Sequence, residues 1–256
     1  MQILDKILKD IPEIPVNEVL VGAFSTLVKA GELSGISSTL RGPGPHGLIE
    51  RAGNIRKLNL KELASFIKSD NLLQASIGMA AINTWTAAYD RPYRQLNAKS
   101  LVYEQGQGKT VGVVGHFPFL NEMKGIDKLY IFEKDPAEGD FSEGDIRKYM
   151  PEAEVVVITG TSLINHTFEE IMKYVRLDAY KIVMGPSTPL SPVLFDYGVD
   201  AVCGTLVKDY EVLRRCVMEA VPVRYLQGKA FVSWLAEDYK NSWKPGNERL
   251  ASEKQK

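Results

Sequence analysis

The sequence contains few of the residues from which metal sites and disulfide frameworks are most often built. Among its 256 residues are only two cysteines and three histidines. Cys203 and Cys216 lack CxxC spacing, so we expect free thiols in a reducing compartment. No two histidines stand in an HxH or HxxxH pair, which leaves the sequence without a metal motif. No G-x-S-x-G elbow occurs either, so a Ser-His-Asp hydrolase is not indicated.

Long apolar runs, a charge excess and a signal peptide are absent as well. No stretch approaches the roughly 20 apolar residues that span a bilayer. The amino-terminal sequence MQILDKILKDIPEIP has acidic residues where a signal peptide carries basic ones. The formal net charge of -1 gives no electrostatic footprint for nucleic acid or an anionic membrane. We therefore expect a cytoplasmic globular protein that binds neither nucleic acid nor membrane, with homo-oligomerisation left open.

The amino-terminal part of the chain combines strand and helix signals. β-Branched residues in 16–31 and 32–40 predict an antiparallel pair of strands. Helices are predicted at 60–68 and 71–90, and the second is apolar nearly all round, as buried helices are. Asn83 is a polar exception in that helix. Because a buried amide needs partners, we expect it either to bind a backbone group or to project into a crevice.

From residue 110 the chain changes to short apolar runs separated by helical segments. The runs are VGVV (111–114), LYIF (129–132), VVVI (155–158), KIVM (181–184) and VDAVC (199–203). The predicted helices between and after them are 118–124, 142–149, 168–176, 192–197 and 209–221. The third of these should begin with a capping box formed by Thr167 and Glu170. Such a succession predicts a parallel sheet covered by helices on both faces.

The ends of the predicted strands share a pattern that points to a ligand site. Four of the five strands end in a glycine before a small or polar turn, at Gly115, Gly160, Gly185 and Gly204, and the fifth ends at Glu133. In open parallel sheets, ligands bind beyond the carboxyl ends of the strands. Glycine there allows a sharp turn and a close approach of the ligand to the backbone. The pattern predicts a crevice lined by the hydroxyls of Thr159, Thr161, Ser162, Ser187, Thr188 and Thr205.

A dinucleotide site explains this pattern poorly. Gly112 and Gly115 are separated by two residues, where the G-x-G-x-x-G fingerprint needs one, and no third glycine follows before Gly125. The bulky Phe117 stands where a pyrophosphate needs bare backbone. Glu133 does have the spacing of the acid that holds a ribose hydroxyl, so adenosylmethionine or another ribose-bearing ligand stays open.

The histidines supply candidate side chains for an acid/base or metal site. His46 lies in a Pro/Gly loop, whereas His116 and His166 fall in loops on the predicted ligand edge. Together with Glu133 and Cys203 they leave a composite metal or acid/base site open. For each isolated histidine, a ring that merely makes a hydrogen bond is the simpler interpretation.

The order of motifs resembles a family described as "putative heavy-metal chelation". The matching stretches are LVGAFSTLVKAGELSGISSTL, SIGMAAINTW, VGVVGHFPFL, LYIFEKDP, VVITGTSLINHTFEEI and IVMGPSTPLSPVLFDYGVD. Members of this family of unknown function join a small α+β domain like the enolase amino-terminal domain to an atypical Rossmann-like α/β domain. With the junction in the polar segment 96–110, we predict domains at 1–98 and 99–245, followed by a polar tail at 246–256.

The resemblance also implies a site between the two domains. The implied lining residues are Asn83, Gly115, His116, Phe117, Glu133, Thr159, Gly160, Thr161, Asn165, Gly185, Pro186, Ser187 and Thr188. The loop of His46 would approach from the other domain. As our own hypothesis, His116 and Glu133 are the candidate metal ligands. Enolase chemistry is not implied, because the barrel that carries its catalytic groups is absent.

Three functions follow as hypotheses. The first is the binding of a small polar ligand in the interdomain crevice, either a divalent transition or heavy metal or a metal-chelating organic molecule. The second is a transferase or lyase that acts on a nucleotide, adenosylmethionine or a pterin-like compound. The third is a regulatory or scaffolding protein. Whether the protein is an enzyme stays open at this point.

Overall fold

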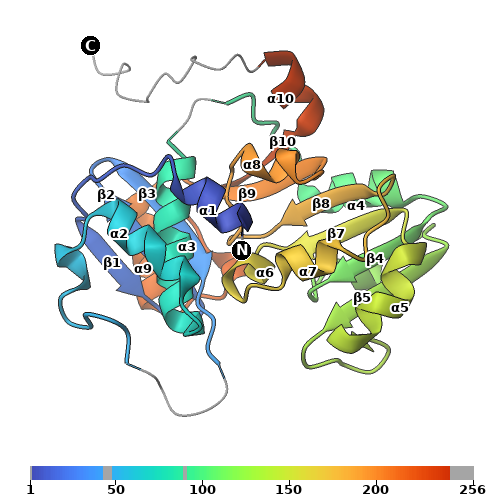
Figure 1. Cartoon of the computed structure of the whole chain (residues 1–256), viewed down its shortest axis with the longest axis horizontal. Helices are drawn as coiled ribbons and strands as arrows, with labels where there is room; N and C mark the ends of the chain where they lie inside the picture. The colour runs from blue at the N-terminus through green and yellow to red at the C-terminus, as the bar shows by residue number, and fades with distance from the viewer. Residues whose placement is uncertain (1, 43–47, 89–90, 243–256) are drawn as a thin grey trace.

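The computed structural model describes residues 2–42, 48–88 and 91–242 and contains two β-sheets flanked by helices (Figure 1). The strands are β1 (Glu18–Val21), β2 (Ser25–Ala30), β3 (Leu33–Ser38), β4 (Thr110–Val114), β5 (Lys128–Glu133), β6 (Phe141–Ser142), β7 (Val155–Thr159), β8 (Tyr180–Met184), β9 (Ala201–Val207) and β10 (Lys229–Leu235). The α-helices are α1 (Gln2–Leu8), α2 (Leu60–Ser65), α3 (Leu72–Thr86), α4 (Ala98–Gly106), α5 (Ile146–Tyr149), α6 (Thr161–Ile164), α7 (Phe168–Met172), α8 (Val193–Asp196), α9 (Tyr210–Met218) and α10 (Ala236–Ser242). The predicted mixed fold, an antiparallel α+β part followed by a largely parallel α/β part, is confirmed.

The amino-terminal part is built on an antiparallel sheet with the order β1-β2-β3. The two predicted segments do pair antiparallel, through β2 and β3, but segment 16–31 holds two strands, β1 and β2. A tight turn separates them, in which the Gly22 amide donates to the Ser25 carbonyl at 2.9 Å. Three short strands therefore replace one long strand and its partner.

Helix α3 covers one face of this sheet and confirms the buried helix predicted at 71–90. It is buried nearly all round, and the Asn71 side chain caps its first turn by accepting from the backbone N–H of Leu73 and Gln74. A Cβ at Gly35 of β3 would collide with the α3 backbone at Thr84. Glycine at this position therefore allows the helix and the sheet to approach closely.

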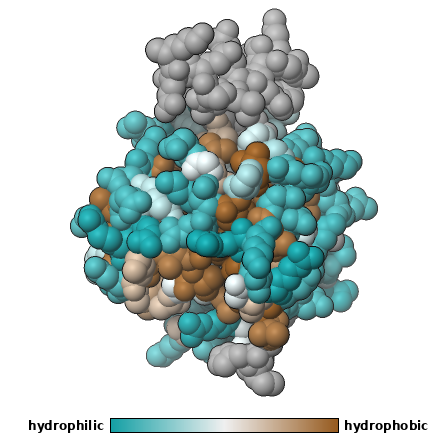
Figure 2. Space-filling model, turned by 90° about the vertical axis from the view of Figure 1, so that its left-hand side faces the viewer, coloured by the Kyte–Doolittle hydropathy of each residue, from teal (hydrophilic) through white to brown (hydrophobic). Residues whose placement is uncertain are grey.

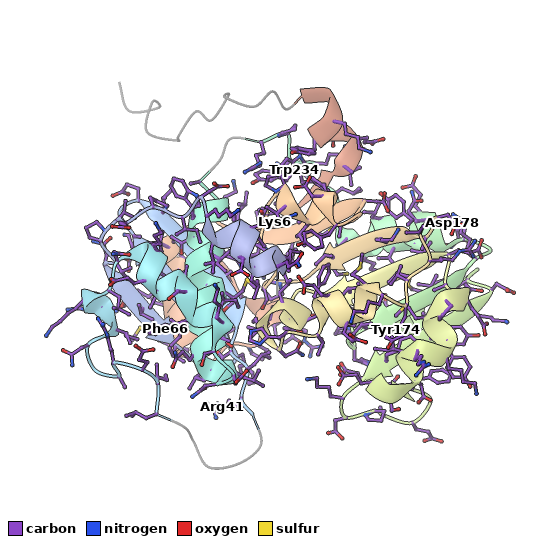
Figure 3. The ribbon with its side chains drawn as sticks, in the orientation of Figure 1. Lys6, Arg41, Phe66, Tyr174, Asp178 and Trp234 are labelled. Atoms are coloured by element: carbon purple, nitrogen blue, oxygen red, sulfur yellow. The ribbon has the colours of Figure 1, made fainter. Side chains whose placement is uncertain are left out.

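Helix α9, which comes from the carboxyl-terminal part, covers the opposite face of the same sheet (Figure 1). Leu27 and Ile36, which are register partners in β2 and β3, form one apolar cluster with Leu213 and Val217 of α9. The two parts of the chain thus share a core. At another contact between the two parts, Lys6 of α1 lies near α8 (Figure 3), with Nζ 4.9 Å from the centroid of the Tyr197 ring.

The large sheet has the strand order β10-β9-β8-β7-β4-β5-β6, and all neighbouring strands are parallel except the antiparallel pair β9 and β10. After β4, the chain adds β5 and β6 on one side of that strand. It then crosses to the other side of β4, where it adds β7, β8 and β9 in order. The point of reversal therefore lies between β4 and β7, where ligand sites of open α/β sheets are found.

Several predictions for this part need correction. Gly204 does not end a strand, because β9 continues past it and pairs with β10, where Gly204 lies opposite Val232. The predicted helix 118–124 is reduced to the single 3-10 turn η3 (Leu120–Glu122). The junction segment 96–110 contains α4, which begins where the Asn97 side chain accepts from the backbone N–H of Lys99.

The predicted capping box at α7 is also wrong. Thr167 precedes the helix with φ -92° and ψ -12° and makes no side-chain cap. Its hydroxyl donates instead to Asn165 Oδ1 at 2.7 Å. The hydroxyl is therefore engaged in the preceding turn.

Figure 2 shows the face of the molecule that carries the amino-terminal part. Hydrophilic residues dominate it, with a hydrophobic area near its centre. Large apolar side chains that are exposed in this part of the fold include Phe24 and, on the end of α9, Met218.

Candidate functional site

A pocket of about 340 Å³ opens at the reversal point of the large sheet. The turn after β4, the end of β5 and the start of the β7–α6 connection line it from the carboxyl-terminal part. Leu40, Arg41 and Leu72 line it from the amino-terminal part, and Arg41 lies at the lower edge of that part in Figure 3. The remaining lining residues are Val114, Gly115, His116, Phe117, Phe132, Glu133, Lys134, Glu143, Ile146, Thr159, Thr161, Ser162, Asn165 and Thr167.

Glycine is required at the exit of β4 for two reasons. Gly115 has φ +106°, a conformation that side chains rarely adopt. A Cβ at this position would also lie 3.0 Å from the Cβ of Thr159, where β7 ends. Its N–H donates to the Phe132 carbonyl at 3.0 Å. The ends of β4, β5 and β7 therefore lie close together at the pocket.

Glu133 anchors the turn that follows β4. Its Oε1 atom accepts from the backbone N–H of His116 at 2.6 Å, and its Oε2 atom accepts from the backbone N–H of Lys134 at 3.1 Å. Both carboxylate oxygens are therefore engaged with backbone, although each retains a lone pair. The predicted ligand-binding acid is also a structural link between β5 and the His116 turn.

His116 has a second acidic neighbour that the sequence analysis did not single out. Its Nδ1 atom lies 3.2 Å from Oδ2 of Asp140. The Asp140 side chain is only 5% exposed, whereas that of His116 is 37% exposed. Asp140 lies in the acid-rich stretch EKDPAEGDFSEGD, where nothing in the spacing distinguishes it from its neighbours.

The exit of β7 presents a small network of hydroxyl groups. Thr159 Oγ1 and Thr161 Oγ1 lie 3.0 Å apart, and Ser162 Oγ donates to the Thr159 carbonyl at 2.7 Å. Asn165 closes the turn by accepting from the N–H and the hydroxyl of Thr167. These groups give the pocket a polar lining at the exit of β7.

The remaining predicted site residues do not line this pocket. Asn83, Pro186 and Ser187 lie instead in the contact between the two parts of the chain, whereas Gly160, Gly185 and Thr188 lie at the exits of β7 and β8. The Asn83 amide donates to the Ile36 carbonyl at 2.7 Å and to the Pro186 carbonyl at 3.1 Å. Ser187 Oγ accepts from the Ser38 N–H at 2.9 Å. Asn83 thus binds backbone groups, the first of its two predicted roles.

Gly160 shows how closely the exits of β7 and β8 are packed against each other. A Cβ there would lie 2.5 Å from the Thr188 amide nitrogen and 2.6 Å from the Thr188 hydroxyl oxygen. Thr188 and Ser187 are only 2% and 1% exposed. The exit of β8 is therefore closed by protein, whereas the exits of β4, β5 and β7 open to the pocket.

The other candidate ligands are placed away from the pocket or beyond the described residues. His166 has φ +63° and directs Nε2 to the Ile67 carbonyl at 2.6 Å. Cys203 is buried in β9 beside β10, where Ser233 Oγ lies 3.2 Å from its Sγ, and burial raises the pKa of its thiol to about 11. A composite site containing Cys203 is therefore wrong. His46 lies outside the described residues.

The charged groups of the pocket are mixed in sign. Arg41 and Lys134 bring positive charge, Glu133 and Glu143 bring negative charge, and Lys134 Nζ lies 4.0 Å from a Glu143 carboxylate oxygen. Over residues 2–42, 48–88 and 91–242, no three His, Cys, Asp or Glu side chains come together in a group that could hold a metal ion. A metal caged by these side chains alone does not fit the described pocket.

The described helices include none that is long and apolar enough to cross a bilayer. This observation agrees with the sequence, in which no apolar run reaches the length of a membrane span.

Comparison with known proteins matches the two parts of the chain to two family models. Residues 97–233 match the family model DUF364 and residues 4–86 match the model DUF4213, and both carry the description "Putative heavy-metal chelation". An uncharacterized protein of Methanocaldococcus jannaschii is 29% identical over 166 residues, which cover 62% of this chain. The match spans 64% of the length of that curated relative.

Two crystal structures share the architecture. A DUF364-family protein of unknown function from Desulfitobacterium hafniense DCB-2 is 30% identical, with a TM-score of 0.79 over 91% of this chain and 97% of that chain. A DUF364-family protein of unknown function from Pyrococcus horikoshii is 17% identical, with a TM-score of 0.75 over 91% and 98% of the two chains, and at this identity the likeness shows the fold alone. The family models and the first of these structures together establish that the chain belongs to the DUF364 family, whose description is putative heavy-metal chelation.

Proposed function

We propose that the pocket between the two parts of the chain binds a small organic molecule with polar or anionic substituents, either free or as its metal chelate. The observation that carries this proposal is the pocket's position. It lies at the reversal point of an open α/β sheet, where such folds bind ligands. Residues from both parts of the chain line it.

The chemistry of the lining supports an organic ligand. Val114, Phe132 and Ile146, with Leu40 and Leu72 of the amino-terminal part, supply an apolar lining. Small-molecule sites are typically apolar with a few polar groups that fix orientation. A flat ring system with polar edges would use both kinds of surface.

The polar groups indicate which substituents this ligand carries. His116, Thr159 and Thr161 offer hydrogen-bonding groups, and Arg41 offers a positive charge that suits a carboxylate or phosphate. The family description mentions metal chelation, whereas the described side chains form no metal-binding group. Both fit if the bound organic molecule itself supplies most of the atoms that coordinate the metal. His116 and Glu133 are then the side chains that would complete its coordination.

Native mass spectrometry of freshly purified protein tests the proposal, because it separates a bound organic mass, a bound metal and their complex. We expect a bound mass that falls in occupancy when Thr159 or His116 is replaced, in the variants Thr159→Val and His116→Ala. Thr205→Val is the matched control, since Thr205 is buried outside the pocket. Equal occupancy in the pocket variants and the control would overturn the proposed site.

Added divalent transition metals provide a second readout through thermal stability, because a ligand that binds only the folded state raises it. If a chelate is the ligand, the metal and a chelating acid such as citrate should raise the melting temperature more together than either does alone. The double variant His116→Ala/Glu133→Ala should lose this increment. If metal and citrate raised the melting temperature of the double variant as much as that of the parent protein, His116 and Glu133 would be excluded as metal ligands.

A nucleoside-like substrate, acted on by a transferase or lyase, is the second candidate. One observation favours it: Glu133 ends the strand next to β4, where dinucleotide-binding folds place the acid for a ribose hydroxyl. The connection after β4 contains only the short turn η3, so no helix N-terminus is positioned for a pyrophosphate. Calorimetric titration should therefore give binding of adenosylmethionine or adenosine without binding of NAD. Binding of NAD alone would contradict this candidate.

We further infer a cytoplasmic location from the unpaired cysteines, and cell fractionation tests this inference. Homo-oligomer formation through the exposed apolar side chains of the amino-terminal part is tested by sedimentation of the purified protein.

A further inference from the structure

His116 is held at two points by two different carboxylates. Glu133 Oε1 accepts from its backbone N–H at 2.6 Å, and Asp140 Oδ2 lies 3.2 Å from its ring Nδ1. The first contact fixes the backbone of the turn, and the second fixes the ring. His116 is thus positioned before any ligand arrives.

Asp140 is itself supported by a closed turn. The Asp140 N–H donates to the Ala137 carbonyl at 3.0 Å, and the Ala137 N–H donates back to Asp140 Oδ2 at 3.2 Å. Gly139 provides the φ of +93° that the turn contains. The next residue begins β6, which pairs with β5, so the carboxylate is tied to the same strand that ends in Glu133.

We propose that Asp140 is a positioning residue that keeps the proton of the neutral His116 ring on Nδ1, so that Nε2 is a lone-pair acceptor available to the pocket ligand. A carboxylate only accepts hydrogen bonds, and a neutral imidazole donates from one nitrogen and accepts at the other. Because Nδ1 faces a carboxylate oxygen, Nδ1 must carry the proton. The ligand then presents an O–H, an N–H or a chelated metal to Nε2. This identification of the ligand's binding group rests on the proposed function.

His166 provides an internal contrast in the same protein. Its Nε2 atom lies 2.6 Å from the Ile67 carbonyl oxygen, which is also only an acceptor. The same reasoning therefore assigns the proton of His166 to Nε2. The two described histidines should hold opposite tautomers.

The tautomers can be measured directly in the ligand-free, ¹⁵N-labelled full-length protein. Long-range ¹H–¹⁵N correlation spectra distinguish protonated from unprotonated ring nitrogens. The variants His116→Gln and His166→Gln assign the signals. We expect an unprotonated Nε2 for His116 and a protonated Nε2 for His166.

The variant Asp140→Asn tests the cause of this preference. An amide both donates and accepts, so the protonated Nε2 form of His116 should gain population while His166 keeps its pattern. An unchanged His166 signal also shows that the variant is folded. Asp135→Asn is the matched control, because Asp135 is an exposed acid in the same connection, and it should leave both histidines unchanged.

Two results would overturn the proposal. The first is a protonated Nε2, or an even mixture of tautomers, in the parent protein. The second is an Asp140→Asn spectrum identical to that of the parent. Neither result depends on a ligand, so this inference can fail while native mass spectrometry still finds a bound molecule. The proposed function fails separately, if no pocket variant alters ligand occupancy.

Discussion

Asn83 offers the most direct test of how the two parts of the chain are joined. It lies in α3, is 5% exposed, and donates to one carbonyl in β3 and another in the loop after β8. The variant Asn83→Ala removes both donors and leaves the carbonyl oxygens of Ile36 and Pro186 without this partner. Because one acceptor lies on each side of the contact, the variant acts on the joint between the two parts.

The size of the effect follows from three contributions. Each lost hydrogen bond costs about 1 kcal/mol net, and the space left by the amide costs about 1 kcal/mol more. An offset comes from Asn83 Oδ1, a buried atom with no hydrogen-bond partner among the described residues, because its removal recovers about 1 kcal/mol of desolvation cost. We expect a net loss of about 2 kcal/mol, or roughly 4 to 8 °C in melting temperature for a chain of this size.

Denaturant unfolding and hydrogen exchange together provide the assay. Thr84→Val is the matched control, since the Thr84 hydroxyl donates to the carbonyls of Val28 and Ala80, both in the amino-terminal part. Both variants should lose stability, but only Asn83→Ala should speed amide exchange in the loop 185–188. A stability loss within the roughly 0.5 kcal/mol of ordinary surface substitutions, or unchanged exchange in that loop, would refute the reasoning.

Three further predictions concern charge, thiols and the division of the chain. Burial raises the pKa of Glu18, but hydrogen bonds from a neighbouring tyrosine and from Arg214 outweigh it, so the folded-state pKa is lowered. The stabilisation is present above the unfolded-state pKa and is lost as the pH falls through the folded-state value, so Glu18→Gln should flatten the acid decline of the melting temperature. At mildly alkaline pH the native protein should react with a thiol reagent at Cys216, whereas Cys203, buried and with its pKa raised to about 11, should react only after unfolding. The fragment 1–98 lacks α9, so it should bind a hydrophobic dye and melt without cooperativity, and a cooperative transition would support an autonomous domain.

The sequence reveals the large sheet and much of the pocket because their signals are local. Apolar runs without alternation mark buried parallel strands, and each strand exit carries its own turn. Gly115, Glu133 and Thr159 could therefore be assigned to one edge before their contacts were known. They lie together because parallel strands place all their carboxyl ends on one side.

The missed residues and the wrong assignments depend on contacts that no local pattern records. Asp140 acquires its role only because β6 pairs with β5 and brings its turn beside His116. Arg41 reaches the pocket from the other part of the chain. Gly204 looked like a strand exit, but the antiparallel partner β10 extends β9 beyond it. In each case a partner distant in sequence decides the outcome.

Tertiary contacts also explain why similar strand exits differ, with the exit of β4 open to the pocket and the exit of β8 closed. Gly185 and Gly115 both follow parallel strands with positive φ, and their sequences alone give no reason to separate them. At the exit of β8, however, Ser38 and Asn83 bind the loop 185–188 from the amino-terminal part. That contact engages the Pro186 carbonyl and the Ser187 hydroxyl, and the pocket opens instead at the exits of β4, β5 and β7. The amino-terminal part therefore covers the exit of β8 and also lines the pocket at the exits of β4, β5 and β7, where we propose that the ligand binds.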